Sequence, residues 1–306
     1  MVYRIGLILL SSLASVVAQT SAAFQFLRTT VSPRSAALGS ATVALPADAG
    51  TVILNPAIGA TVERQTLSST FLKHVLDINA GMLLYSGLPI FSGRLTIGAV
   101  YMDYGVFDRR DANGQPLGQF SAHDVALAAW YSDTLEPRLF YGIGPKLVWE
   151  RLDQQHAWAL AFDAGLLYTF PDQRTSAALS LLHVGTPLHH SPQPSLPTDL
   201  RIGLTHFLQG LPAIFNLSFV HLTEPTPSVW QKFANFVVGI EFRLSSVLQL
   251  RLGYDNLLRR AAPARQRGVT GMGVGTGITL SNIRIDYSAT LVSAAALHRL
   301  GIQMDM

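Results

Sequence analysis

From about residue 64 to the end of the chain, apolar residues recur at every second position. In the segment 248–255, one face carries three leucines and a tyrosine, and the other carries Gln, Arg, Gly and Asp. The segments 283–288 and 236–244 alternate in the same way. A period of two is typical of β-strands with two unlike faces, so this part of the chain is predicted to form a sheet.

The scarcity of charge indicates which kind of sheet to expect. Only 13% of the residues are charged and the mean hydropathy is +0.30, whereas a soluble domain has about 25% charged residues. A soluble sandwich would need charged outer faces, and a helical membrane bundle would need further apolar runs of about 20 residues. We therefore expect an all-β transmembrane antiparallel barrel, with apolar side chains outside and polar side chains inside.

Several other classes of protein are excluded by composition. The net charge of +3 is too small to indicate a nucleic-acid partner. The absence of cysteine excludes disulfides, thiolate metal sites and a cysteine nucleophile. The glycine-rich run 271–277 precedes a strand turn and not a helix, so it does not match a dinucleotide-binding fingerprint. We expect no cofactor.

Counting the alternating segments gives fourteen expected strands. An even number is what a single-chain bacterial barrel requires, and a mean length of about ten residues fits a tilted crossing of the hydrocarbon layer. The expected strands are 64–71, 79–86, 93–104, 123–131, 139–149, 156–169, 175–184, 198–206, 213–222, 233–244, 247–254, 270–280, 283–290 and 296–306.

The connections between these strands alternate in length. Tight turns are expected at 171–174, 245–246 and 281–282. Short turns of such barrels face the periplasm and long loops face the exterior, so both chain termini are predicted to be periplasmic in the outer membrane of a Gram-negative bacterium. The long loops are expected at 105–122, 185–197, 223–232 and 255–269.

The N-terminus is typical of an exported protein. One arginine precedes an apolar stretch, and Val16-Val17-Ala18 before Gln19 has the small-residue pattern of a cleavage site. Residues 1–18 are interpreted as a signal peptide, with a cut near Ala22-Ala23 as the alternative.

Residues 19–62 lack the alternation and are too short for another pair of hairpins, whereas residues 63–306 make up the expected barrel. We interpret 19–62 as an N-terminal plug inside the barrel mouth. Its turn-forming and small residues include Pro33, Arg34, Gly39, Asn55 and Pro56.

One strand supports the plug. Gly271, Gly273, Gly275 and Gly277 fall on a single face of the segment 270–280. Glycine inside a strand often marks the close approach of another backbone, so this face is expected to contact the plug. A bend in the barrel wall is the alternative explanation.

Candidates for catalysis are weak. A barrel hydrolase needs a serine, a histidine and an orienting carboxylate or carboxamide near the membrane boundary. Ser121 with His123-Asp124, and His298, lie near expected strand ends, but the chain has no Gly-x-Ser-x-Gly elbow. His189-His190 have no third metal ligand nearby. We therefore expect neither an enzyme nor a metal site.

Two charged loop segments are candidate partner-binding surfaces. Asp108, Arg109 and Arg110 lie in the loop expected at 105–122. A dense arginine cluster lies in the loop expected at 255–269, where the guanidinium fork suits lipopolysaccharide phosphates or an acidic partner. A solvated loop is the alternative for this cluster, which consists of Arg259, Arg260, Arg265 and Arg267.

Several stretches resemble a known family. Residues 24–57 (FQFLRTTVSPRSAALGSATVALPADAGTVILNPA) resemble the N-terminal motif of the PorV/PorQ outer-membrane barrels, which are akin to FadL-type fatty-acid transporters. Residues 102–124 (MDYGVFDRRDANGQPLGQFSAHD) are similar to the PorQ branch, and 250–260 and 268–291 resemble the closing strands of the family. Met306 departs from the aromatic residue that commonly ends bacterial barrels.

The resemblance implies a FadL-like barrel of fourteen strands in the type IX secretion system, without catalytic residues. It implies attachment-complex partners comparable to PorZ and the PorU sortase, in addition to outer-membrane lipids and lipopolysaccharide. The function expected on this basis is docking or anchoring of the attachment complex during cargo export.

A FadL-like channel for hydrophobic small molecules is the alternative function. Such a channel requires an apolar pocket in the lumen beside the plug. The expected inner faces argue mildly against a pocket of this kind, because they carry Gln249, Arg251, Asp255, Arg284 and Asp286.

Overall fold

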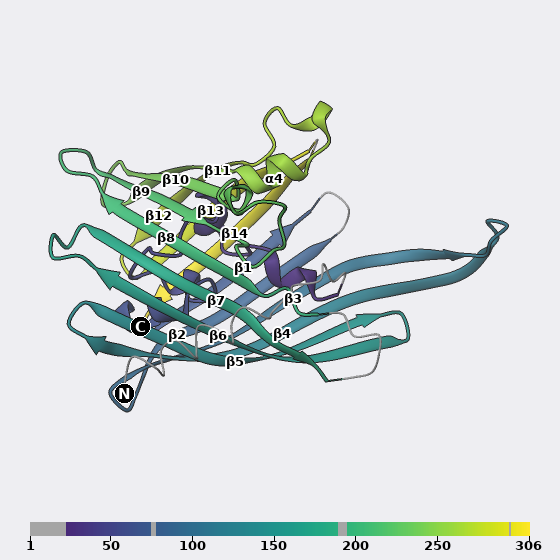
Figure 1. Ribbon diagram of the computed structural model, residues 1–306, viewed down its shortest axis with the longest axis horizontal. Helices are drawn as coiled ribbons and strands as arrows, with labels where there is room; N and C mark the ends of the chain where they lie inside the picture. Colours follow the sequence, from purple (N-terminus) through teal and green to yellow (C-terminus); the bar gives the residue numbers. More distant parts are fainter. Residues whose placement is uncertain (1–22, 75–77, 189–194, 294) are drawn as a thin grey trace.

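The computed structural model describes residues 23–74, 78–188, 195–293 and 295–306. It is a closed barrel of antiparallel strands that neighbour one another in chain order (Figure 1). The first strand pairs with the last, from Thr66 opposite Asp305 to Lys73 opposite His298. The prediction of an antiparallel barrel with fourteen strands is confirmed. The signal peptide expected over 1–18 lies outside the described residues.

All fourteen strands overlap the segments expected from the sequence, and most ends agree within three residues. The strands are β1 (Thr66–Lys73), β2 (Asn79–Ile90), β3 (Gly93–Arg110), β4 (Pro116–Glu136), β5 (Leu139–Leu152), β6 (Gln155–Thr169), β7 (Thr175–Pro187), β8 (Asp199–Phe207), β9 (Ala213–Phe219), β10 (Phe236–Arg243), β11 (Leu248–Asp255), β12 (Met272–Leu280), β13 (Ile283–Val292) and β14 (Ala295–Asp305).

Side chains of the wall alternate between two environments. On β11, Leu250 and Leu252 are 43% and 51% exposed on the outer face, whereas Arg251 between them is 1% exposed. An apolar outer face around a polar interior is typical of barrels that cross a membrane. Among the described residues, no helix is long and apolar enough to do so.

The two ends of the barrel differ. The short-turn end has tight connections such as residues 281–282, and it contains the C-terminus. The opposite end, which we call the long-loop end, carries short helices in its connections. These are α3 (Val229–Lys232), α4 (Asn256–Ala261) and the 3-10 helix η5 (Ala264–Gln266).

The largest difference from expectation is the hairpin of β3 and β4, which projects well beyond the barrel (Figure 1). The loop predicted at 105–122 is wrong, because strand pairing continues to Arg110 opposite Pro116. Cross-strand contacts stabilise the extension: the rings of Phe107 and Phe120 stack with centroids 5.3 Å apart. Only residues 111–115 form the turn.

Residues 23–62 form a plug in the lumen, drawn in purple in Figure 1. Most of its side chains are buried, including Phe24, Leu38 and Ile58. The predicted plug is confirmed, with short helical turns where the sequence is rich in small residues. These elements are η2 (Gln25–Arg28), α2 (Pro33–Ala37), η3 (Ala49–Thr51) and η4 (Pro56–Thr61).

Candidate functional site

The plug helix α2 lies against a row of glycines in the barrel wall. Gly239, Gly253 and Gly273 stand opposite one another on the adjacent strands β10, β11 and β12. A Cβ atom on Gly253 would lie 2.2 Å from the backbone nitrogen of Gly39, and one on Gly273 would lie 2.6 Å from the carbonyl oxygen of Ala36. The absence of side chains therefore creates the hollow that holds α2.

The four glycines singled out on β12 have different surroundings. Gly273 and Gly275 face α2, since a Cβ on Gly275 would lie 2.6 Å from that of Ala37. Gly277 instead faces the side chains of Arg251 and Asp286. Gly271 precedes the strand with φ +88° and lies against the carbonyl oxygen of Asp255, so it belongs to the rim.

The plug residues singled out in the sequence lie at its tightest contacts. Gly39 has φ +65°, and its position against the backbone of Tyr254 leaves no room for a side chain. Asn55 caps η4 by accepting from the amide of Ala57 at 3.1 Å, and it donates to the carbonyl oxygen of Val43 at 2.9 Å. Pro33 and Pro56 both begin helical turns.

Six charged side chains form a closed ring between the plug and the wall, which we call the six-charge ring. Arg34 and Asp48 belong to the plug, and the other four belong to β10, β11 and β13. Arg34 donates two hydrogen bonds of 2.7 Å to the carboxylate of Glu241 and a third of 3.0 Å to Asp48. The members in order around the ring are Arg34, Asp48, Arg284, Asp286, Arg251 and Glu241.

The remaining contacts close the ring with alternating signs. Arg251 donates to Glu241 at 2.7 Å and to Asp286 at 2.6 Å. Arg284 donates to Asp286 at 2.8 Å and to Asp48 at 3.1 Å. The three arginines and three carboxylates of the ring balance one another in charge, and the half-exposed Arg243 lies next to the ring, 3.8 Å from Glu241.

Asp48 shows the electrostatic effect of the ring. Burial would raise the pKa of its carboxyl group, but attraction to Arg284 and Arg34 outweighs burial and holds the pKa well below its usual range. The carboxylate also accepts the amide of Gly50 at 3.1 Å and thereby caps η3. Asp48 therefore stays charged and ties the plug to the wall.

The opposite side of the plug faces an apolar part of the wall. A small cavity of about 20 Å³ lies between plug residues such as Phe26 and Ile53 and wall residues such as Val100. Phe26 and Val100 belong to a large cluster of buried apolar side chains that spans both plug and wall. The cavity is lined by Phe26, Leu27, Thr29, Ile53, Leu84, Gly98, Val100, Ala126, Ala128, Trp130, Lys146 and His183.

A compact polar cluster borders this apolar cavity. Asp163 accepts from Lys146 Nζ at 2.7 Å, from Trp130 Nε1 at 2.9 Å and from the amide of His183 at 2.8 Å. His183 has φ +60°, which turns its backbone amide toward Asp163. Because these polar groups bond to one another, they leave the cavity predominantly apolar.

A larger cavity of about 440 Å³ opens at the long-loop end, and we call it the vestibule. Thr29 lines both the vestibule and the apolar cavity, so the segment around it separates the two spaces. Arg28 in the same segment donates to Glu224 at 2.5 Å. Leu257, Leu258 and Leu297 contribute apolar surface to the vestibule.

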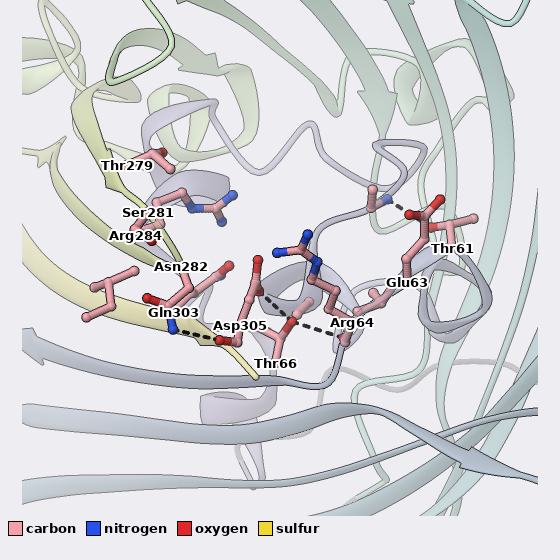
Figure 2. A pocket seen from close by; sticks show the side chains of 14 residues that line it. Thr61, Glu63, Arg64, Thr66, Thr279, Ser281, Asn282, Arg284, Gln303 and Asp305 are labelled. Carbon is pink, nitrogen blue, oxygen red and sulfur yellow. Dashed lines mark hydrogen bonds between the residues drawn. The ribbon is translucent and has the colours of Figure 1, made fainter.

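A third cavity, of about 320 Å³, lies at the short-turn end and is polar. Figure 2 shows Arg64, Glu63 and Asp305 among the side chains around it. Thr66 donates to the Asp305 carboxylate at 2.8 Å, and Asn282 donates to the Asp305 carbonyl at 2.9 Å. The lumen thus changes from apolar beside η2 to strongly polar near this end.

The charged residues proposed as partner sites occupy two separate places at the long-loop end. Asp108, Arg109 and Arg110 lie in the projecting part of the β3–β4 hairpin, where Arg109 pairs with Asp153. The arginine cluster lies on α4, on η5 and just after it. Its members are Arg259, Arg260, Arg265 and Arg267.

The histidines considered for catalysis have other partners. His123 Nδ1 lies 3.0 Å from the hydroxyl of Tyr101, and His298 Nδ1 lies 2.7 Å from the hydroxyl of Tyr287. His123 Nδ1 also lies 3.2 Å from the carboxylate of Asp103. Within the described part of the chain, neither histidine has a hydrogen bond to a serine, and no group of three potential metal ligands occurs. His189 and His190 lie outside the described residues.

Sequence reasoning missed the six-charge ring and the apolar cavity. The charges of Arg251, Arg284 and Asp286 were visible on inner faces, but their plug partners lie far away in sequence. The cavity had a signal in the segments 79–86 and 123–131, where apolar and small residues occupy both faces of the strands.

No family model matches the chain, and no curated protein matches it. Solved structures share its fold. The Ralstonia pickettii toluene transporter TbuX aligns with a TM-score of 0.55 and 14% identity over 90% of this chain and 98% of TbuX. The CymD monoaromatic hydrocarbon channel has a TM-score of 0.62 and 13% identity over 93% and 99% of the two chains. A Pseudomonas aeruginosa FadL homologue has a TM-score of 0.56 and 11% identity over 90% and 98%.

These similarities confirm the predicted FadL-like, outer-membrane-type barrel and correct the preferred function. The prediction of a docking component of type IX secretion is wrong, because the structures that share this barrel are transporters and channels of the FadL type. The resemblance to the PorV/PorQ family and the expected partners stay untested predictions. The fold of this chain is that of a FadL-like barrel.

Proposed function

We propose that this chain is a non-enzymatic outer-membrane channel that admits small hydrophobic compounds. The observation that carries the proposal is the small apolar cavity between the plug and the wall of β2 to β5. The similar structures TbuX and CymD, a toluene transporter and a monoaromatic hydrocarbon channel, support the same class of ligand. In this proposal the long-loop end faces the exterior and both termini are periplasmic.

The entry path follows from the two cavities. A compound enters the vestibule, which has apolar surface from Leu257, Leu258 and Leu297. It then reaches the apolar cavity by displacing the segment around Thr29 that separates the two spaces. The cavity of about 20 Å³ is far smaller than the several hundred Å³ of a ligand pocket. The described arrangement is therefore the closed state of the channel.

The plug prevents leakage of ions in this closed state. Its two sides are sealed by different means: the six-charge ring and the glycine row on one side, and apolar packing on the other. A hydrophobic molecule separates apolar side chains more easily than paired charges, because its own surface replaces the apolar contacts that are lost. Hydrophobic compounds are accordingly expected to pass on the apolar side.

The proposal is tested by filling the apolar cavity. Ala128 lies on the inner face of β4 and lines this cavity, so Ala128→Phe should block it. We expect the initial influx of radiolabelled toluene into cells carrying this variant to fall at least several-fold. Ala289→Phe on the outer face of β13 is the matched control and should leave influx unchanged. Equal influx through both variants would contradict the proposed path.

The absence of catalysis has its own test. If the chain is a channel alone, the purified barrel should hydrolyse p-nitrophenyl esters no faster than detergent micelles do. His123→Ala and His298→Ala should not change that background rate, because both histidines contact tyrosines and lie away from the apolar cavity. A rate above background that either substitution abolishes would favour an enzyme.

A further inference from the structure

The arginine cluster at the long-loop end carries a charge that nearby residues do not neutralise. From Asn256 to Thr270 the chain has four arginines and no acidic residue. Among the described residues, none of the four forms an ion pair with a carboxylate. The other charged candidate surface differs, because Arg109 pairs with Asp153 and Arg110 pairs with Asp108.

Neutral acceptors hold three of these arginines in place. Arg259 donates to the hydroxyl of Tyr254 at 3.1 Å, and Arg260 donates to the side-chain oxygen of Asn235 at 3.2 Å. Arg267 donates to the carbonyl oxygens of Ala262 at 3.0 Å and Arg260 at 3.3 Å. The guanidinium groups are thus ordered while their charge stays uncompensated, which favours binding of an anion.

The cluster also lies at the upper edge of the lipid-facing wall. Tyr254 is the last outward residue of β11 and follows the exposed Leu250 and Leu252 on the same face. Its ring lies 6.1 Å from that of Phe236, and aromatic side chains at this level are typical of the membrane–water interface. Val269 and Met272, which follow the cluster in the chain, also expose apolar surface. A cationic patch therefore adjoins an apolar one.

We propose that this surface binds the phosphorylated head group of an outer-leaflet glycolipid, with the acyl chains along β11 and β12. The guanidinium fork matches phosphate oxygens with two parallel hydrogen bonds, whereas the apolar wall below favours acyl chains. A free phosphate ion would use only the first of these features, and an acidic protein would not use the second. The inference rests on the proposed orientation of the barrel in the outer membrane.

The test uses the full barrel in detergent and bisphosphorylated lipid A as the probe, with binding measured by native mass spectrometry. We expect the variant with Arg259, Arg260, Arg265 and Arg267 all changed to Gln to bind lipid A at least about tenfold more weakly, since each arginine near an anionic surface contributes favourably. The double variant Arg109→Gln/Arg110→Gln is the matched control and should bind as the wild type does. Lipid A without its phosphates should bind the wild type as weakly as the quadruple variant binds lipid A.

Three outcomes would overturn the inference: unchanged binding by the quadruple variant, equal binding of dephosphorylated lipid A, and full displacement by inorganic phosphate at equimolar concentration. If the quadruple variant does not fold, Arg259→Gln/Arg265→Gln replaces it, because this pair gives up only the bond to Tyr254. Lipid A binding is measured without any transport step, so its failure is distinguishable from failure of the proposed channel.

Discussion

The plug meets the barrel wall differently on its two sides. Toward β10 to β13, the backbone of α2 lies in the glycine row, and the six-charge ring ties Arg34 and Asp48 to the wall. Toward β2 to β5, apolar side chains pack around a small cavity. Charge pairing and close backbone contact tolerate little displacement, whereas apolar side chains can be repacked around a ligand. The side toward β10 to β13 therefore anchors the plug, and we call it the anchored side. The side toward β2 to β5 can yield to a ligand, and we call it the yielding side.

Loss of one carboxylate from the six-charge ring should destabilise the protein most. Glu241→Gln removes the carboxylate shared by Arg34 and Arg251 and leaves a buried positive charge uncompensated. We expect the free energy of unfolding, measured by urea titration in lipid vesicles, to fall by about 3 to 5 kcal/mol. Asp108→Asn, in an exposed pair, should cost less than about 1 kcal/mol. If both variants lost a similar free energy of unfolding, the charges of the six-charge ring would be screened by water.

The glycine row should be the next most sensitive feature. Gly253→Ala places a methyl group against the backbone of Leu38 and Gly39, and overpacking of this kind costs about 1 to 3 kcal/mol. Gly268→Ala is the control, since a Cβ there meets no atom within 4 Å. If thermal unfolding shifts equally in both variants, α2 moves away from the wall and the anchored side is less rigid than inferred.

Acid should weaken the anchored side through Asp48. The folded-state pKa of Asp48 lies below its ordinary value of 3.8, so its stabilising contribution is complete above that value and is lost as pH falls toward the folded pKa. From pH 5 to pH 3 this group should account for roughly 1 kcal/mol of lost stability. The pH dependence of unfolding should be shallower in Asp48→Asn over this interval. If the free energy of unfolding depended on pH equally in the wild type and in Asp48→Asn, Asp48 would not contribute to the loss of stability in acid.

A substitution on the yielding side should change the free energy of unfolding least. Ile53→Val removes one methyl group at the apolar cavity and should cost about 0.5 kcal/mol, at the low end for such changes. The same change should raise toluene influx, because the packing that closes the cavity becomes looser. Ile278→Val, on the outer face of β12, should alter neither quantity. Reduced influx in Ile53→Val would show that this side does not yield.

Much of the barrel could be predicted because a strand with two environments imposes a period of two on its own sequence. The ends of β11 and β13 agree within about two residues for this reason. The sequence predicts a loop in place of the β3–β4 extension because Asp108, Arg109 and Arg110 interrupt the alternation of apolar residues. A hairpin outside the membrane is solvated on both faces, so alternation is not required of it.

The candidate site was less predictable because it depends on pairs that are distant in the sequence. Arg34 and Glu241 are separated by 207 residues, and nothing local to either indicates the other. The alignment of Gly239 with Gly253 and Gly273 requires the strand register, which pairs residues across two turns. The apolar cavity does not follow from the polar inner faces of β11 and β13, because it is lined by other strands, chiefly β2 to β5.

β3 and β4 extend beyond their neighbouring strands, so the projecting hairpin and the closed barrel can open independently of each other. Past Asp103 on β3 and before Ser121 on β4, strand pairing in the described residues joins these two strands only to each other. One side-chain pair, Arg109 with Asp153, links this part of the hairpin to the turn after β5. The amides of this hairpin therefore exchange hydrogen with solvent through local opening, while those of the closed barrel exchange only when the ladder itself opens. The hairpin can bend or unzip outside the barrel without changing the shape of the lumen.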